Sequence, residues 1–378
     1  MEKLVSFLKE KEIEMVNVLR ELVELESPSH DKELVDQVGR KISEIFARYV
    51  GGPLVVIENS GAGNIIRAEF GVGEEQILIL THMDTVWPKG TLENMPFRIE
   101  EDKVYGPGTF DMKGGIVQGL FALHALRELN VNLKRKVVML VTPDEESGSE
   151  TSRSLIEEEA KKSKYVLVLE SAASKEGKLK TSRKGVGMFT IKVKGCASHA
   201  GIEPEKGVSA IDELAGVIKY LHSLTDFEKG TTLNVGVIKG GTSSNVVAAE
   251  AEAELDLRVT TNDEFDRVIP LIMNMKPSRE GISIEVTGGI NRPPLEKIIE
   301  VSRMFQLARE LSEKYLDFRL EDQLSGGGSD GSFASQFAPT LDGLGPVGDG
   351  AHARNEYLLK SQMPVRSALV ALLIAKLG

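Results

Sequence analysis

The chain has little of several features that define whole classes of protein. It contains one cysteine, Cys196, which excludes an internal disulfide framework and fits a reducing compartment. No apolar run approaches the roughly 20 residues of a membrane span. The 46 basic and 57 acidic residues give a net charge of −11, so there is no basic excess for binding a nucleic-acid backbone. We therefore expect neither a nucleic acid nor a membrane as partner.

The first 25 residues give no sign of a signal peptide. They carry charged side chains among apolar positions at helical spacing, such as Met15, Leu19 and Leu22, whereas a signal peptide has an uninterrupted apolar core. The cytoplasm is the expected location, although a mature chain that had lost a leader would look the same.

The length of 378 residues predicts two domains, because single cores stop growing beyond about 250–300 residues. Helical stretches at 115–129 and 152–162 separate some of the unbroken apolar runs. Such runs are typical of strands buried on both faces, and the alternation predicts an α/β domain whose mixed, largely parallel sheet is flanked by helices. These runs lie at Leu54–Ile57, Ile77–Leu80, Val137–Val141 and Val166–Leu169.

Between residues 183 and 288 the pattern changes to strand, helix, strand, strand, helix, strand. This order predicts a two-layer α+β unit of the ferredoxin-like type, inserted into the larger domain of residues 1–182 and 289–378. In the strand at 248–259, apolar residues alternate strictly with charged ones. One face of this strand should be covered, and the other should meet water or a partner. After residue 288 we expect a helix at 295–315 and a closing helix from Ser361.

His82 and Asp84 follow directly on the apolar run Ile77–Leu80. The end of a strand is where ligands usually bind in open α/β sheets, so His82 is a candidate metal ligand. Asp84 could accept the other imidazole N–H and so orient the ring. Taken alone, the motif also describes a His–Asp pair in an ordinary loop.

Further carboxylates lie in comparable places. Asp111 ends a Gly-rich loop at the start of a helix, where it would cap the helix and could at the same time bridge two cations. Asp144, Glu145 and Glu146 follow the run Val137–Val141, and such adjacent carboxylates repel one another unless exposure or cations relieve them. Two zinc ions would neutralise the charge and leave one Glu free to transfer a proton.

Glu170 closes a fourth apolar run, and His352 supplies a second imidazole from the far end of the chain. His352 alone would be a surface loop histidine. Combined with the other candidates, it completes two sites that share one carboxylate, a ligand set suited to zinc.

These segments together resemble the di-zinc aminoacylase and carboxypeptidase family of metallopeptidases, and within it the bacterial glutamate carboxypeptidases. The likeness covers nearly the whole chain, including the inserted unit. It implies two Zn²⁺ per subunit, with Co²⁺ or Mn²⁺ as alternatives because His/carboxylate sets accept all three. It also implies that Asp111 bridges the ions, that the Asp111–Met112 bond is cis, that Glu145 is the general base and that Asp84 orients His82. The implied metal ligands are His82, Asp111, Glu146, Glu170 and His352.

The inserted unit shares further motifs with the family. The turn at 198–201 resembles an S-H-A-G turn whose histidine, here His199, reaches the active site of the other subunit, which implies a homodimer formed through this unit. Arg258, beside Asn245, matches the family's carboxylate-binding arginine, although a cross-strand ion pair is the alternative. The resemblance also suggests three weaker substrate-side positions, namely Lys178, Arg292 and Gly327 of the Gly-rich loop.

The resemblance implies a metal-dependent exopeptidase that hydrolyses the amide bond of a C-terminal residue, glutamate by the nearest likeness, in small peptides or N-acyl amino acids. Water held between two zinc ions has a pKa of about 7, so Glu145 would take its proton and pass it to the departing amine. The carboxypeptidase choice depends on Glu170, because related aminopeptidases usually have Asp there. The alternatives are a di-zinc aminopeptidase for di- and tripeptides, an N-acyl amino acid deacylase, and a metal-binding protein that has lost catalysis.

Overall fold

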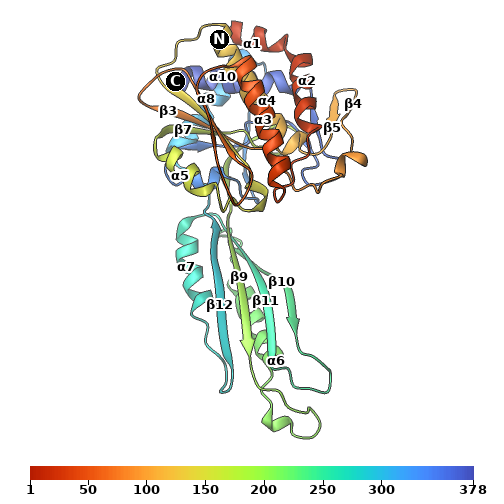
Figure 1. The fold of residues 1–378 in the computed structure, drawn as a ribbon. Coiled ribbons are helices and arrows are strands. Elements are labelled where there is room, and N and C mark those ends of the chain that lie inside the picture. Colours follow the sequence, from red (N-terminus) through yellow and green to blue (C-terminus); the bar gives the residue numbers. More distant parts are fainter. The chain divides into compact units, whose positions relative to one another are not determined.

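The computed structural model describes residues 1–378, which form two compact units (Figure 1). The first unit contains Met1–Ser182, Lys297–Ser325 and Ser329–Gly378. The second unit contains Arg183–Glu296 and Gly326–Gly328, so it interrupts the sequence of the first.

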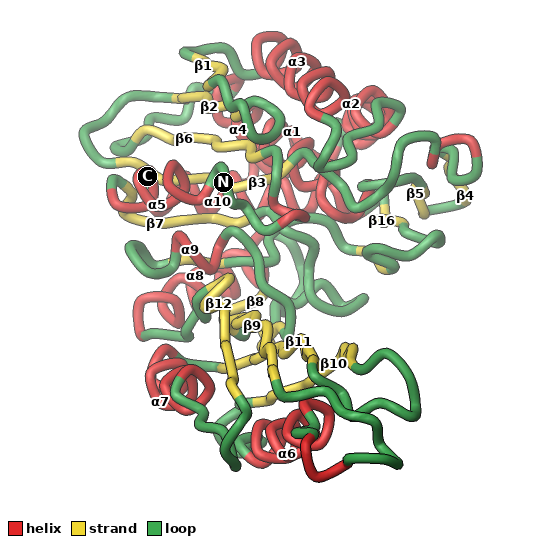
Figure 2. Tube along the Cα trace, turned by 60° about the horizontal axis from the view of Figure 1, so that its bottom comes forward, coloured by secondary structure: helices red, strands yellow, loops and turns green.

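A six-stranded mixed sheet forms the centre of the first unit. Its strand order is β1-β2-β6-β3-β7-β14, and Figure 2 shows β1, β2, β6, β3 and β7 in this order. The strands from β6 to β14 run parallel, whereas β1 and β2 are antiparallel to their neighbours. The predicted fold class is confirmed. The strands are β1 (Leu54–Ile57), β2 (Ile65–Phe70), β3 (Gln76–His82), β6 (Lys136–Thr142), β7 (Ser163–Val168) and β14 (Thr340–Leu341).

Helices cover both faces of this sheet, which explains its unbroken apolar strands. Ile77 and Ile79 of β3 pack on one face with α1 to α4, α8 and α10, whereas Leu78 and Leu80 pack on the other with α5 and α9. No helix of the chain is both long enough and apolar enough to span a membrane. The helices are α1 (Glu2–Lys9), α2 (Glu12–Val23), α3 (Lys32–Tyr49), α4 (Gly114–Glu128), α5 (Arg153–Lys161), α8 (Ile299–Tyr315), α9 (Gly331–Ala334) and α10 (Gln362–Leu377).

Two smaller sheets complete the first unit. One pairs β8 (Leu179–Arg183) with β13 (Asp322–Ser325). The other has the order β15-β16-β5-β4, and within it Tyr357 of β16 pairs with Tyr105 of β5. This pairing places a C-terminal segment of the chain next to the start of the loop at residues 106–113, which follows β5. The strands of the second sheet are β4 (Arg98–Glu100), β5 (Lys103–Tyr105), β15 (Gly348–Asp349) and β16 (Tyr357–Leu359).

Some local predictions for the first unit were wrong. The run Leu54–Ile57 is an edge strand, with Val55 52% and Val56 48% exposed, because β1 has a neighbour on one side only. Strand β2 was not predicted, because its segment contains Arg67 and Glu69 within the apolar pattern. The helix expected from Leu295 begins at Ile299, because Leu295 forms a β-bridge with Arg183.

The second unit consists of one antiparallel sheet and two helices. The strand order is β10-β11-β9-β12, and both helices pack on the same face, as Figure 2 shows. The apolar residues of β11 are buried in this core and its charged residues lie on the opposite face, as the strict alternation predicts. The elements are β9 (Gly185–Lys194), α6 (Ala210–Ser223), β10 (Thr232–Gly240), β11 (Glu250–Val259), α7 (Asn262–Met273) and β12 (Ser283–Arg292).

Candidate metal centre

Acidic and imidazole side chains gather at one edge of the six-stranded sheet. The parallel strands β3, β6 and β7 end at this edge, so the residues that follow them become neighbours in space. His82 is the last residue of β3, Glu146 follows β6 and Glu170 follows β7. Asp111 lies in the loop before α4, and His352 lies in the loop between β15 and β16.

The distances place the Asp111 carboxylate between the two imidazoles. His82 Nε2 lies 3.3 Å from Asp111 Oδ1 and 3.4 Å from Glu170 Oε1. His352 Nε2 lies 3.4 Å from Asp111 Oδ2 and 3.1 Å from Glu146 Oε2. Each carboxylate oxygen of Asp111 therefore faces a different imidazole, and each imidazole has one further carboxylate of its own.

A glycine allows the Asp111 loop to come so close to the strand ends. A Cβ atom on Gly115, at the start of α4, would lie 2.1 Å from the carbonyl oxygen of Leu169. Only a residue without a side chain permits this approach, which brings the helix start next to Glu170. The Asp111–Met112 peptide bond is cis, as the resemblance implied.

The ligand atoms fit a divalent cation. His82, Asp111 and Glu146 each offer one ligand atom within 4.8 Å of the others, and so do His82, Glu145 and Glu170. Imidazole nitrogens and carboxylate oxygens are the ligands expected for zinc and similar metals.

The electrostatics of the cluster also favour positive charge at its centre. Burial by itself lowers the pKa of His82, but hydrogen bonds with Asp111, Asp84 and Glu170 raise this pKa well above its usual value. Hydrogen bonds with Asp111 and Glu146 raise the pKa of His352 to about 10. Burial raises the pKa of Glu146. The carboxylates thus produce a negative potential that bound cations would neutralise.

Asp84 makes more contacts than the sequence indicated. The Nδ1 atom of His82 lies 3.0 Å from the main-chain oxygen of Asp84 and 3.3 Å from its Oδ1. The buried Asp84 carboxylate also accepts hydrogen bonds from the backbone N–H groups of Glu145 (3.2 Å) and Glu146 (3.1 Å). Asp84 therefore ties the His82 strand end to the loop that carries both glutamates.

Glu356 was not predicted as a site residue, although it holds the Asp111 loop. Its side chain is 1% exposed. Its Oε1 accepts from the N–H groups of Phe110 (2.9 Å) and Asp111 (3.0 Å), and its Oε2 accepts from Gly108 N (3.0 Å) and Trp87 Nε1 (2.9 Å). Burial raises the pKa of Glu356 to about 7 despite these bonds. A single acid in a turn-rich segment resembles a solvated residue, so the sequence carried no signal for it.

Asp330 belongs to the Gly-rich loop that resembles a family motif, but it was not predicted as a site residue. It ends the Gly-rich loop at 325–330 and is buried. Its carboxylate accepts a hydrogen bond from Thr142 Oγ1 (2.8 Å) and another from the hydroxyl of Ser149. Thr142 and Ser149 flank the loop that carries Glu145 and Glu146, so Asp330 binds both ends of this loop.

Two of the predicted residues of the second unit are neighbours. His199 forms a β-bridge with Val246, and the carbonyl oxygen of Asn245 accepts a hydrogen bond from Ala200 N (2.9 Å). The Oδ1 atom of Asn245 also accepts from the hydroxyl of Ser243 at 2.6 Å. Both His199 and Asn245 are exposed, so their polar atoms can reach solvent or a ligand.

Arg258 forms an ion pair within its own strand. Its Nε and Nη2 atoms each lie 2.8 Å from an oxygen of Asp256, and its Nη1 donates to the carbonyl of Gly326 at 3.4 Å. The sequence allowed an ion pair for Arg258, and the structure places the acidic partner on the same strand rather than across the sheet. A ligand carboxylate would have to compete with Asp256 for this guanidinium.

The three weaker candidates lie in different surroundings. Lys178, in the first unit, pairs with Glu321 at 2.9 Å. In the second unit, Arg292 is buried at the end of β12, next to Gly328, and the carbonyl oxygen of Gly327 accepts a hydrogen bond from Arg183 at 3.0 Å.

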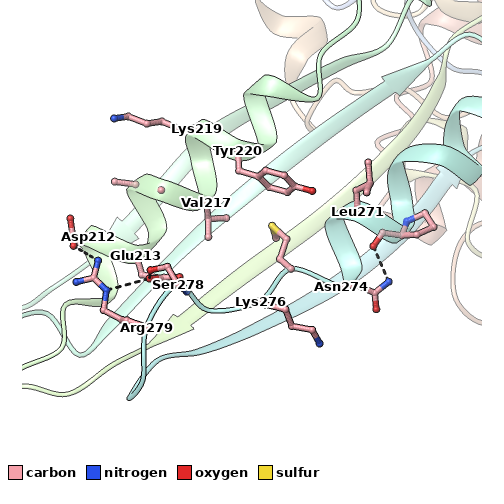
Figure 3. A pocket seen from close by; sticks show the side chains of 14 residues that line it. Asp212, Glu213, Val217, Lys219, Tyr220, Leu271, Asn274, Lys276, Ser278 and Arg279 are labelled. Carbon is pink, nitrogen blue, oxygen red and sulfur yellow. Dashed lines mark hydrogen bonds and ion pairs between the residues drawn. The ribbon is translucent and has the colours of Figure 1, made fainter.

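A groove of about 710 Å³ lies between α6 and α7 of the second unit (Figure 3). At one end Arg279 pairs with Asp212 at 2.5 Å, and Glu213 accepts a hydrogen bond from Ser278 N at 2.7 Å. None of the predicted site residues lines this groove. Its volume alone is no reason to place the substrate there.

Comparisons with known proteins agree on one family. The profile of "Peptidase family M20/M25/M40" matches residues 78–376. The chain is 31% identical to carboxypeptidase G2 of Pseudomonas sp. strain RS-16 over 380 residues, covering 96% of this chain and 89% of that protein.

Solved structures show the same fold. Aminopeptidase PepT from Bacillus cereus superposes with a TM-score of 0.80 at 22% identity, covering 97% of this chain and 98% of that one. The YxeP protein of Bacillus subtilis, described as a dinuclear metal-binding peptidase, superposes with a TM-score of 0.73 at 16% identity, covering 98% and 99%. From the matched profile and the relative above 30% identity, we conclude that this chain belongs to peptidase family M20/M25/M40 and is a metallopeptidase.

Proposed function

We propose that this metallopeptidase is an exopeptidase that releases the C-terminal residue of small peptides or N-acyl amino acids, with glutamate as the first candidate for that residue. The observation that carries the proposal is the Asp111 carboxylate between two imidazoles, with Glu145 in the same cluster. The name of the Pseudomonas relative, a carboxypeptidase, supports the direction of cleavage.

We assign five residues as ligands of two divalent metal ions, with zinc as the first candidate. His82 and Glu170 would hold one ion, His352 and Glu146 the other, and Asp111 both. Once bound, the ions would polarise the scissile carbonyl and lower the pKa of a water molecule to about 7. Co²⁺ and Mn²⁺ suit the same ligand types.

The residues of the chain transfer the proton. Glu145 takes a proton from the attacking water and delivers it to the departing amine, which a carboxylate beside the reacting atoms is suited to do. Its backbone N–H is bound to Asp84, so the loop that presents it is fixed. Asp84 also fixes the ring of His82 through Nδ1.

The second unit supplies substrate recognition and dimerisation in this proposal. Arg258 binds the carboxylate of the released residue, because a guanidinium matches a carboxylate with two parallel hydrogen bonds. Asn245 does not lie beside Arg258 as expected but next to His199, at the opposite end of the β9–β11 pair, and makes a further substrate contact there. His199 stabilises the oxyanion in the partner subunit's site, which makes the homodimer the active form. Lys178, Arg292 and Gly327 make weaker substrate contacts.

We also assign the α/β domain of residues 1–182 and 289–378 the catalytic role, and residues 183–288 the dimerisation role. The single cysteine, whose thiol is exposed, supports a cytoplasmic location.

The test is a screen of dipeptides with free and with blocked N-termini, combined with metal analysis of the same sample. We expect about two metal ions per chain and hydrolysis of N-blocked substrates that end in a free carboxylate. Turnover only of substrates with a free N-terminus would instead make the enzyme an aminopeptidase. Hydrolysis of simple N-acyl amino acids, without cleavage of N-blocked dipeptides, would make it a deacylase.

A further inference from the structure

We propose that Glu356 is a positioning residue that holds the loop at residues 106–113 in the shape in which the Asp111 carboxylate faces both imidazoles. This inference rests on the proposed function, because it takes Asp111 as the shared metal ligand. Glu356 itself touches neither the substrate nor the metal ions.

The Glu356 carboxylate has four hydrogen-bond donors, and most of them belong to the loop that it holds. Four N–H groups point at one carboxylate, two at each oxygen, at distances of 2.9 to 3.0 Å. Three of them are backbone amides of Gly108, Phe110 and Asp111, all within the loop itself. Buried amides without an acceptor are costly, so the loop conformation and the Glu356 carboxylate require each other.

The backbone next to Glu356 is anchored in a small sheet. The next residue, Tyr357, begins β16 and pairs with Tyr105 of β5, which ends just before the loop. The backbone of Glu356 is thereby fixed to one end of the loop while its side chain binds the middle. The third amide belongs to Asp111, so a shift of this amide would shift the carboxylate that lies 3.3 Å from His82 and 3.4 Å from His352.

A glutamine at position 356 could not accept all four hydrogen bonds. A carboxylate offers acceptors on both oxygens, whereas a glutamine amide offers one oxygen and an NH₂ group that only donates. In Glu356→Gln one pair of N–H donors would face another donor. The substitution thus disrupts the shape of the loop at residues 106–113, although the volume of the side chain at position 356 is nearly unchanged. It therefore tests the hydrogen-bonding role of Glu356 selectively.

The experiment compares Glu356→Gln with Glu159→Gln. Glu159 is also a buried carboxylate of the first unit that several groups hold, namely Arg67 (3.2 Å), Gln76 (3.0 Å) and Lys162 (3.0 Å), but none of its partners belongs to the metal centre. Metal-free protein is titrated with Zn²⁺ in competition with a chromophoric chelator. We expect the affinity of Glu356→Gln for at least one ion to fall about 10- to 100-fold, the usual effect of losing a group that orients a ligand. Glu159→Gln should lose stability but bind both ions like the wild type.

Equal affinities of Glu356→Gln and the wild type would overturn the inference. A wild type that binds no metal would instead defeat the proposed function, so the two failures are distinguishable. If Glu356→Gln does not fold, hydrogen exchange in the metal-free wild type decides. Amides 108, 110 and 111 should exchange slowly without metal, because Glu356 rather than the ions holds them, and rapid exchange there would equally refute the role.

Discussion

Glu356 of the first unit and Glu264 of the second are both carboxylates held by several donors, yet their pKa values move in opposite directions. Burial raises the pKa of Glu356 to about 7, although neutral amides donate to it. A hydrogen bond from the Arg267 guanidinium lowers the pKa of Glu264 to about 2. A full positive charge nearby stabilises a carboxylate far more than amide dipoles do. Next to its candidate metal centre, the first unit thus buries a carboxylate that only neutral N–H groups bind, whereas Glu264 of the second unit is paired with a base.

The difference extends beyond these two residues. In the first unit, the acids at the sheet edge face imidazoles and one another. In the second unit, Asp256 pairs with Arg258, and Asp212 pairs with Arg279. Surface pairs of this kind contribute about 0–1 kcal/mol to stability. Changes to the acids at the sheet edge of the first unit should therefore affect chemistry and metal binding, and changes to these charged pairs of the second unit should affect recognition or stability.

The largest expected effect comes from Glu145→Gln. We expect turnover to fall at least about a hundredfold, the low end for loss of a general acid/base, while metal content stays near two ions per chain. Steady-state kinetics and elemental analysis of the same sample measure both. Glu150→Gln is the matched control, because Glu150 is exposed in the same segment. Undiminished turnover in Glu145→Gln would show that Glu145 is not the general base. The expectation that the sheet-edge acids of the first unit serve the chemistry would then lose its main support.

Arg258→Ala tests recognition by the second unit. Loss of a charged hydrogen bond of about 1.5–3 kcal/mol should raise KM for a carboxylate-terminated substrate roughly 10- to 150-fold. Metal content should stay at the wild-type level, because Arg258 belongs to the second unit. Arg279→Ala, which breaks the pair with Asp212, serves as the control and should leave KM unchanged. An unaltered KM in Arg258→Ala would mean that its guanidinium serves only the pair with Asp256.

The fold class and the convergence of distant side chains could be predicted because both depend on strand ends. A strand buried on both faces appears as an unbroken apolar run, and the polar residue that follows must lie at the sheet edge. His82, Glu146 and Glu170 satisfy this rule, and the structure brings them together. Their roles stay proposals.

Glu356 and Asp330 could not be predicted from the sequence, because each acts through contacts with residues distant in the chain. Glu356 binds amides about 245 positions earlier, and Asp330 binds Thr142. Neither contact produces a periodic pattern or a characteristic residue spacing in the amino-acid sequence. The edge position of β1 was missed for a related reason, since an apolar run of that length looks the same at the centre and at the edge of a sheet.

A smaller effect is expected from pH on the second unit. Because the hydrogen bond from Arg267 lowers the pKa of Glu264 from the ordinary value of 4.5 to about 2, the stabilisation is present above pH 4.5 and is lost as the pH falls towards 2. Urea unfolding of the wild type and of Glu264→Gln should therefore differ more at pH 6 than at pH 3. If the difference in unfolding free energy between the two proteins did not depend on pH, the pair of Glu264 and Arg267 would add no stability. The contrast between Glu264 and Glu356 would then be a difference in burial alone.

The smallest effect is expected from Trp87→Phe, and its smallness is informative. The indole N–H is one of the four donors to Glu356, and Trp87 is the only tryptophan of the chain. Phenylalanine removes this donor but leaves the three loop amides in place, so we expect a loss of about 1 kcal/mol in stability and a change in Zn²⁺ affinity of less than about threefold. The competition titration used for Glu356→Gln measures the affinity, and urea unfolding measures the stability. Both variants lose the hydrogen bond between Trp87 and Glu356, and this bond is the only change that they share. If Trp87→Phe weakened metal binding as strongly as Glu356→Gln, the indole N–H rather than the three loop amides would be the contact of Glu356 that matters for metal binding.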